Sequence, residues 1–492
     1  MRLAATIRLS CQRRLFRDGI AFRRGMAVFG SALFLAGCQK FSPDRGMEPV
    51  AVFSNQELKM DIVAIRSEED ALAARSAVKG LLKRPLTAGT AVQIALLNNR
   101  GLQAAYNELA IAEAMMVGAS LPPNPIISLS QLTGSGAVEI ERRIVADILA
   151  LATLPARAEV AGDRFRQAQL RAIAETLRVA ADTRRVYYRA VTLRELASFL
   201  VQAQSAAEVA TQLAKRLGET GALNKLDQAR EQVFYADITV QLAAARQRAA
   251  SERERLIRLL GLWGSDLDFQ LPSALPSLPA RPRTLPAVEI EAIRRRVDLQ
   301  ITRIEVDTLA KSYGLTQATR FINLLDVAGI SRTTRDPGGD PFRQRGIEVE
   351  FQVPLFDFGQ VRVRAAEQTY LEAVNRLSEK AINVRSEARD AYRSYRSTYD
   401  VAAHYQREVL PLHQIISEEM MLRYGAMQID VFSLLAEARQ RLNTTMAAIE
   451  ARRDFWLAST DLMTAVIGGG VGSVTSENLR PMATTETGAA GH

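Results

Sequence analysis

Residues able to carry out chemistry are few in this chain. The sequence holds three histidines, His404, His413 and His492, and two cysteines, Cys11 and Cys38. His404 and His413 lack the i, i+4 spacing that places two metal ligands on one helix face, so each is predicted to be a single surface side chain. No glycine motif for binding phosphates or dinucleotides is present. The sequence therefore predicts a protein that is not an enzyme, has no catalytic or metal site, needs no cofactor and draws energy from a partner.

Cys38 ends a segment with the features of a secretory signal. The first 25 residues are basic, and the apolar run that follows, Met26–Leu35, is too short to span a bilayer. This run closes on LAGC, which resembles the lipobox of bacterial lipoproteins, whose cysteine is acylated. We predict a lipoprotein signal peptide over 1–37 and lipidation of Cys38; the alternative is a small apolar residue without lipid. Translation is taken to start at Met1 because a start at Met26 would remove the basic residues.

The charge of the mature chain excludes one class of function. The full sequence has a formal net charge of +9, but seven arginines and one aspartate precede Cys38, which leaves +3. A nucleic-acid-binding protein keeps a clustered basic face after processing. We therefore predict no nucleic-acid partner.

The order of segments indicates an internal repeat. Residues 271–286 contain five prolines, which a helix cannot accommodate, so they are predicted to link two repeats at 85–270 and 287–468. Each repeat reads as a shorter helix, two strands, a very long helix, a glycine turn and a second long helix. Residues 38–84 are predicted to be an extended lipidated segment, and 469–492 a disordered tail.

The longest predicted helix, 157–217, has no proline and would be roughly 90 Å long. Its apolar residues alternate at spacings of three and four, which predicts a coiled-coil hairpin with the helix that follows the turn at 218–224. Alone, this pattern also fits a scaffold hairpin. The predicted seam residues are Leu193, Leu196, Leu200, Ala203, Ala207, Ala210, Ala214 and Leu217 on the first helix and Leu226, Ala229, Val233, Ala236, Val240 and Ala243 on the second.

Four strands are predicted, at about 126–132, 137–149, 321–330 and 346–355. The last alternates apolar residues with Glu348, Glu350 and Gln352, as a transmembrane strand does with lipid on one face and a lumen on the other. A half-buried hairpin on a soluble domain would alternate in the same way. Open strand edges are not tolerated in lipid, so a spanning chain must form oligomers, and two or three chains satisfy the minimum strand number. The predicted lipid-facing residues are Ile347, Val349, Phe351 and Val353.

Residues 86–468 resemble the TolC-like outer-membrane efflux family, specifically its lipoprotein branch. The resemblance lies in 87–125 before the first strands, 353–368 after the last strand and the turn at 422–440. It implies a mainly α fold with a small β part: long antiparallel coiled-coil hairpins in two repeats, each adding a β-hairpin to a trimeric, twelve-stranded outer-membrane barrel that an α-helical barrel continues into the periplasm. It also implies a periplasmic adaptor and an inner-membrane pump as partners.

The resemblance further implies that the turns at Gly218, Gly221 and Gly425 form the periplasmic tip, where adaptors dock and the duct narrows. Asp430 matches one of two gate aspartates found in some members, but Ser433 stands at the second position. Glu437 is predicted to be an ordinary surface residue, and Met420, Met421 and Met427 to be packing residues rather than metal ligands.

The predicted function is a passive exit duct for small molecules or ions, lipid-anchored in the outer membrane and extending into the periplasm. The alternative is a periplasmic coiled-coil scaffold lipoprotein without a pore. Whether the exported compound is a drug, a metal cation such as copper or another substrate is left open, as are the particular pump and adaptor.

Overall fold

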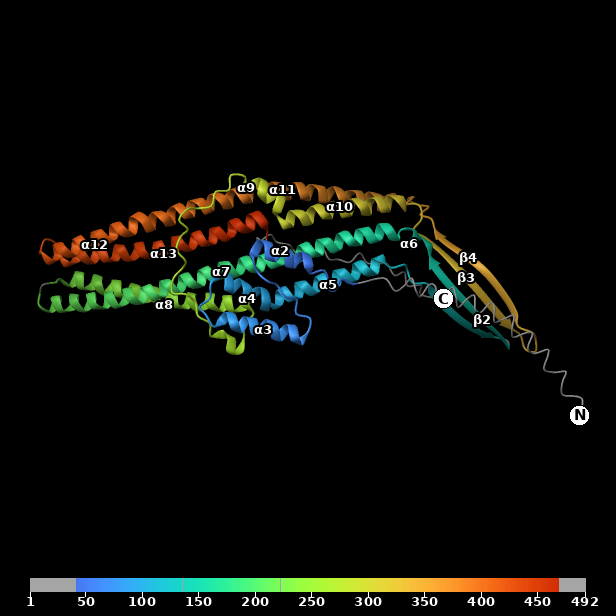
Figure 1. The fold of residues 1–492 in the computed structure, drawn as a ribbon, viewed down its shortest axis with the longest axis horizontal. Coiled ribbons are helices and arrows are strands. Elements are labelled where there is room, and N and C mark those ends of the chain that lie inside the picture. Colours follow the sequence, from blue (N-terminus) through green and yellow to red (C-terminus); the bar gives the residue numbers. More distant parts are fainter. Residues whose placement is uncertain (1–40, 135, 222, 469–492) are drawn as a thin grey trace, which may run out of the picture.

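The protein is an elongated molecule with its strands at one end and two helical turns at the other (Figure 1). The computed structural model describes residues 41–134, 136–221 and 223–468. The predicted signal peptide, Cys38 and the predicted tail lie outside these residues. Within them, every helix is too short or too polar to cross a bilayer.

The predicted fold class is confirmed, because two copies of one series of elements form most of the chain. The longest helix of the first copy has 66 residues, and the matching run of the second copy, 360–425, has the same length. The first copy contains α4 (Ala88–Asn98), α5 (Arg100–Ser120), β1 (Ile126–Gly134), β2 (Ala137–Asp147), α6 (Ile148–Ala152), α7 (Leu154–Glu219) and α8 (Lys225–Leu260). The second contains α9 (Val288–Arg295), α10 (Val297–Ala318), β3 (Leu324–Arg335), β4 (Phe342–Gln352), α11 (Gln360–His404), the π-helix η2 (Tyr405–Val409), α12 (Leu410–Gly425) and α13 (Val431–Ile467).

The second long helix is interrupted where the first is not. Pro411 lies two residues beyond η2 and lacks a backbone N–H, so a regular α-helix cannot pass through it without losing a hydrogen bond. The π-turn at Tyr405–Val409 accommodates this loss. The α11–α12 run therefore remains continuous while its path changes direction between the middle of the molecule and the tip.

Helix α7 packs against α8 through the seam that its sequence predicts. Leu200, Ala203, Ala207 and Ala214 are all buried. The predicted seam of α8 is wrong: Leu226, Val233 and Val240 are 61%, 59% and 69% exposed. The residues that face α7 are instead Glu231, Ile238, Leu242 and Ala245. The apolar pattern of α8 has two faces, and the position of the turn decides which one meets α7.

The four strands form one antiparallel sheet in the order β1-β2-β3-β4. Several predicted strand boundaries need correction. β2 ends at Asp147 rather than 149, because Asp147 caps α6 by accepting from the Ala150 N–H at 2.7 Å. β3 and β4 extend further toward their loop than predicted, since the mostly polar residues 333–335 and 342–346 continue the backbone ladder, and β4 ends at Gln352. Backbone pairing does not depend on apolar alternation, so the alternation pattern predicted too few strand residues next to the loop.

The segment before the first repeat is not extended as predicted. It contains α2 (Glu48–Leu58) and α3 (Glu68–Leu82), which lie beside the first repeat (Figure 1). Ser67 and Asp70 form a capping box at the start of α3, in which each side chain accepts from the other's backbone N–H. This local signal, rather than an apolar stripe, accounts for the helix.

The proline-rich linker crosses the middle of the molecule as an ordered strap. Residues 268–287 hold no helix or strand, yet their carbonyl groups accept hydrogen bonds from the helices beneath. The Tyr399 hydroxyl donates to the carbonyl of Pro279 at 3.0 Å, and the Trp456 indole donates to that of Pro276 at 3.1 Å. The main core lies under this strap, where α4, α7, α11 and α13 meet. Burial raises the pKa of Tyr187 to about 12, and its hydroxyl donates to the Leu86 carbonyl at 2.8 Å.

We expect Gly359→Ala to destabilise the joint between β4 and α11. Gly359 has φ +72°, and a Cβ there would lie 2.1 Å from the Arg320 carbonyl oxygen. The left-handed backbone alone costs an alanine roughly 1–2 kcal/mol. Gly314→Ala is the matched control, because its Cβ would meet nothing within 4 Å and it lies inside α10; it should be neutral or stabilising. Thermal loss of the helical circular dichroism signal measures both, and equal melting temperatures would contradict the expectation.

Candidate functional site

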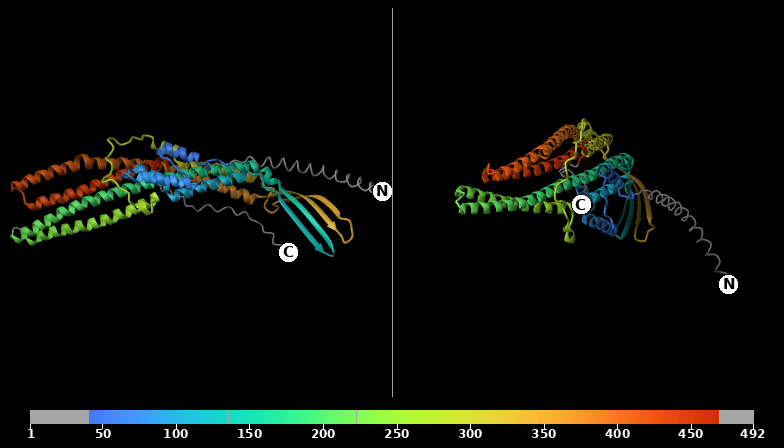
Figure 2. Two further views of the ribbon diagram at one scale, coloured as in Figure 1. Left: turned by 60° about the horizontal axis from the view of Figure 1, so that its bottom comes forward. Right: turned by 60° about the vertical axis from the view of Figure 1, so that its left-hand side comes forward.

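The predicted site residues lie at opposite ends of the molecule. The α7–α8 and α12–α13 turns are together at one end, and the sheet forms the other (Figure 1). In the two further views the hairpins remain separate pairs of helices toward their turns (Figure 2). The structure thus brings Gly218, Gly221, Gly425 and Asp430 to one tip, while Cys38 lies outside the described residues.

The first turn contains two glycines, and the backbone favours glycine at Gly221. Gly221 has φ +76°, a conformation that favours glycine. Gly218 lies inside the last turn of α7, and a Cβ there would be 2.0 Å from the Gln228 amide nitrogen. Asn224 then begins α8 by accepting from the Asp227 N–H at 2.9 Å. The turn is therefore tight, and the start of α8 lies directly against the end of α7.

The second turn is built differently from the prediction. Gly425 ends α12 without a left-handed backbone, and Met427 takes that conformation instead, at φ +59°. The Gln428 N–H donates to the Arg423 carbonyl at 2.9 Å and closes the turn. Met427 is 94% exposed and Met421 is 61% exposed, so the predicted packing role of these methionines is wrong within the chain. Met427 is exposed at the turn itself, whereas Met421 lies in α12 and borders the groove between the hairpins.

Asp430 is the N-cap of α13. One of its carboxylate oxygens accepts from the Ser433 hydroxyl at 2.6 Å and from the Ser433 N–H at 2.9 Å. These hydrogen bonds hold the pKa of Asp430 below its ordinary value of 3.8. Because folding lowers this pKa, the charged Asp430 cap stabilises the fold at any pH above 3.8. The stabilisation is lost as the pH falls through the lowered pKa of the folded protein. Ser433 thus fixes the position of the Asp430 carboxylate.

Three ion pairs join the two hairpins along their length. They are Arg439 with Glu231, Arg452 with Glu195, and Arg185 with Asp461. The Glu231 side chain is only 3% exposed, and Arg439 also lies 4.6 Å from the centre of the Phe234 ring. Removing one partner of a buried pair leaves an uncompensated charge, which costs roughly 3–5 kcal/mol. The pair nearest the tip therefore resists separation of the hairpins.

His413 and Glu437 are not the isolated surface residues that were predicted. The His413 Nδ1 lies 2.9 Å from a Glu437 carboxylate oxygen, and its Nε2 lies 3.2 Å from the Thr444 hydroxyl. Their side chains are 15% and 13% exposed. The contact depends on the register of α12 against α13, which spacing along one helix cannot reveal.

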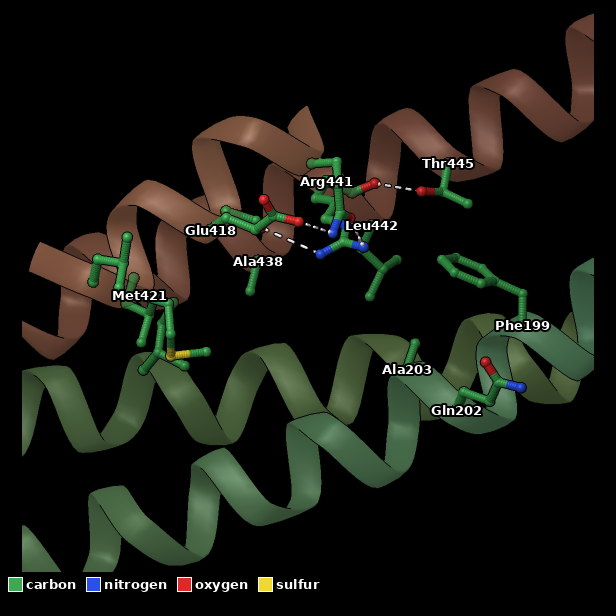
Figure 3. A pocket seen from close by; sticks show the side chains of 14 residues that line it. Phe199, Gln202, Ala203, Glu418, Met421, Ala438, Arg441, Leu442 and Thr445 are labelled. Atoms are coloured by element: carbon green, nitrogen blue, oxygen red, sulfur yellow. Dashed lines mark hydrogen bonds between the residues drawn. The ribbon is translucent and has the colours of Figure 1, made fainter. Parts of the chain in front are cut away.

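A groove of about 890 Å³ separates the hairpins close to the tip (Figure 3). Phe199 and Ala203 of α7 face Met421 of α12 and Ala438 of α13 across it. Arg441 lies at its edge and donates to the Gln414 side chain at 2.7 Å. An apolar floor with a polar edge is suited to contact with another protein chain.

The sheet has one apolar and one charged face. Ile347, Val349 and Phe351 lie on the apolar face, while Val353 follows the end of β4. On the opposite face Arg143 pairs with Glu348 at 2.7 Å, and Arg332 pairs with Glu141 at the same distance. The charged face carries six carboxylates against these two arginines: Glu139, Glu141, Asp147, Asp326, Glu348 and Glu350.

A sheet with two chemically distinct faces, continued by helical hairpins of this length, has the architecture of an outer-membrane channel subunit. Several solved structures share the fold, including the three that follow. The Campylobacter jejuni CmeC outer membrane channel matches with a TM-score of 0.67 and 16% identity, over 78% of this chain and 86% of that one. The outer membrane protein VceC of Vibrio cholerae matches at 0.65 and 14%, over 80% and 97%. CusC, in structures concerned with transmembrane channel formation, matches at 0.64 and 17%, over 77% and 92%.

Residues 290–468, which form most of the second repeat, match the family model of the outer membrane efflux proteins. This match confirms the resemblance to the outer-membrane efflux family over most of the second repeat. No curated protein sequence matches the chain. The family and the structural neighbours are channels rather than enzymes. Together they support the predicted function of an outer-membrane efflux channel, and nothing found supports the pore-free scaffold.

Proposed function

We propose that three copies of this chain form a passive exit duct across the outer membrane, with a barrel of twelve strands and a helical tunnel in the periplasm. The observation that carries the proposal is the sheet: four strands with one apolar face and two free edges, joined to long hairpins. Two chains would also supply enough strands to close a barrel. The family resemblance favours three.

In this proposal Ile347, Val349 and Phe351 face lipid. They are 81%, 54% and 62% exposed in the single chain, so none of its described segments covers them. Such exposed apolar area needs a partner, and lipid tails provide one. Val353 is 41% exposed just beyond β4 and continues the apolar surface toward the helices. The carboxylates on the opposite face would line the lumen and favour cations.

We expect Phe351→Arg to deplete the assembled oligomer in the outer membrane. An arginine on the lipid face near the bilayer midplane costs roughly 2–4 kcal/mol per strand. Glu350→Gln is the control, because Glu350 is the neighbouring residue on the opposite face. Oligomer recovered from membranes and separated by semi-native electrophoresis is the measurement. Equal recovery of both variants would count against a membrane strand here.

We propose that the periplasmic tip restricts the duct. Asp430 lies in the second tip turn, and three copies would place three carboxylates around the axis if it faces the lumen. The Arg439–Glu231 pair holds the hairpins together close to the same turns. Opening would require the hairpins to move apart, and a partner that binds both would supply the energy.

Conductance in planar bilayers tests both the duct and its gate. We expect wild-type protein to show small, cation-preferring openings. Asp430→Asn should weaken the cation preference without loosening α13, because asparagine caps a helix about as well as aspartate. Asp430→Ala should lose the charge and also about 1 kcal/mol of capping, seen as faster amide exchange in the first turn of α13. Inserted, trimeric wild type without any conductance would disprove the duct, whereas normal conductance with an unchanged preference in Asp430→Asn would disprove only the gate.

We further propose that a periplasmic adaptor docks at the tip and links the duct to an inner-membrane pump. The groove between the hairpins and the exposed side chain of Met427 support this assignment. Methionine side chains adapt to irregular partner surfaces, and this one has no contact to lose on binding. The exported compound follows from the pump and adaptor in this scheme.

The lipid anchor at Cys38 is also a proposal. Ser42 donates its N–H to Glu113 at 2.7 Å and thereby fixes the start of the described chain on α5. Glu113 lies seven residues before the end of α5, which leads to β1, so Ser42 is about 10 Å along the helix from that end. Four residues reach at most about 14 Å. The segment from Cys38 to Ser42 is therefore long enough to reach the end of α5 that leads toward the sheet.

Cys38→Ser should abolish incorporation of radioactive palmitate, because the acyl chain requires the thiol. Label is measured in the outer-membrane fraction after immunoprecipitation. Cys11→Ser is the matched control and should label normally, since Cys11 precedes the predicted cleavage site. Undiminished label on the Cys38 variant would show that the anchor is elsewhere.

A further inference from the structure

The apolar face of the sheet becomes basic toward the loops that connect β1 to β2 and β3 to β4. Its row nearest the middle contains Ile127, Ile144 and Ile347 at matching register positions, which are 70%, 55% and 81% exposed. One row further from the helices, the same face contains Arg142 and Arg345. The following two rows add Arg343 and then Arg335. We call these four arginines the basic belt.

The belt differs from the arginines of the charged face in having no carboxylate partner. On the charged face, Arg143 and Arg332 each contact glutamates. All four belt arginines are exposed, and none forms an ion pair with any residue in the described ranges. Asp336 and Asp340 lie in the β3–β4 loop, and neither forms an ion pair with a described residue. The belt charges are therefore available to an external anion.

A second copy of the chain cannot neutralise the belt. Closing the barrel would place β1 of one copy beside β4 of the next. On the face that carries the belt, β1 presents Ile127, Leu129, Gln131 and Thr133, none of which is charged. The oligomer itself thus leaves Arg343 and Arg345 without counter-ions.

The membrane restricts where the belt can lie. An arginine on the lipid face costs roughly 2–4 kcal/mol at the bilayer midplane but about 0–1 kcal/mol at the interface. Two arginines share one row, and two more lie beyond it, so the hydrocarbon core must end near this row. The exposed apolar residues on its helical side, including Val349, Phe351, Leu355 and Phe356, mark the other side of the boundary. The belt then lies at the level of the outer-leaflet headgroups.

We propose that Arg142, Arg335, Arg343 and Arg345 bind the phosphate groups of the phosphorylated glycolipid in the outer leaflet of the outer membrane. This inference rests on the proposed orientation of the sheet in the membrane. The guanidinium group donates two parallel hydrogen bonds to one phosphate and keeps its charge at any physiological pH. The belt would fix the height of each subunit in the membrane and retain a ring of lipid around the barrel.

Binding of purified lipopolysaccharide to the full-length, detergent-solubilised oligomer tests the proposal. The variant is R142Q/R335Q/R343Q/R345Q, and a second variant with lysine at all four positions retains the charge. The matched control is Arg332→Gln, which removes an arginine of the same sheet from the opposite face. We expect the glutamine variant to bind at least tenfold more weakly, the lysine variant to retain most binding and the control to change less than twofold. Dephosphorylated lipopolysaccharide should bind wild type as weakly as the glutamine variant binds the intact lipid.

The outcomes separate this inference from the channel proposal. Equal affinity of wild type and the glutamine variant, or equal affinity of wild type for both lipids, overturns the belt. Conductance is measured in parallel in phosphatidylcholine bilayers, which lack the glycolipid. Normal conductance with undiminished lipid binding by the glutamine variant rejects the belt alone. If wild type shows no conductance, the channel proposal is rejected, whatever the result of the lipopolysaccharide-binding measurement.

Discussion

Unpaired backbone at the two edges of the sheet is the constraint on which the rest of the structure depends. β1 and β4 each pair on one side only, so each leaves a row of N–H and C=O groups along its outer side. Water can satisfy these groups, but hydrocarbon cannot. Because the same sheet has an apolar face suited to lipid, one chain alone cannot satisfy its edge N–H and C=O groups there. In the proposed oligomer, β1 and β4 of further copies satisfy these groups without exposing a new edge.

The long helices extend the need for a closed ring from the sheet to the opposite end of the molecule. Each β-hairpin continues into a long helix, and each long helix returns, so four strands at one end become four helices at the other (Figure 1). Any symmetry that closes the strands must also bring the hairpins around the same axis. The matching lengths of α7 and the α11–α12 run then place both turns of every copy at one level. A ring of turns is a natural place to restrict a passage.

The two repeats of one chain are held together more extensively in the middle of the molecule than at the tip. Around the middle, the strap of residues 268–287, the aromatic side chains beneath it and the main core hold both repeats together. Toward the tip, the hairpins are joined by few ion pairs and separated by a groove. The polar contacts there exchange more readily than a packed apolar core. The tip is thus the part of the molecule where the hairpins can move with the least loss of stability.

Sequence alone determined the class of this protein and most of its elements. Periodicity predicted the long helix α7 and its seam, and alternation predicted the β-hairpin of the second repeat, because both patterns record which side of an element avoids water. The seam of α8 could not be predicted in this way, since Val233 and Ile238 lie on two apolar faces and only the α7–α8 turn selects between them. The same holds for the contact of His413 with Glu437 and for the left-handed backbone at Met427, which depend on the register between helices. The belt, too, required the pairing register, because Arg142 and Arg345 are far apart in the sequence and become neighbours in one row only when the strands align.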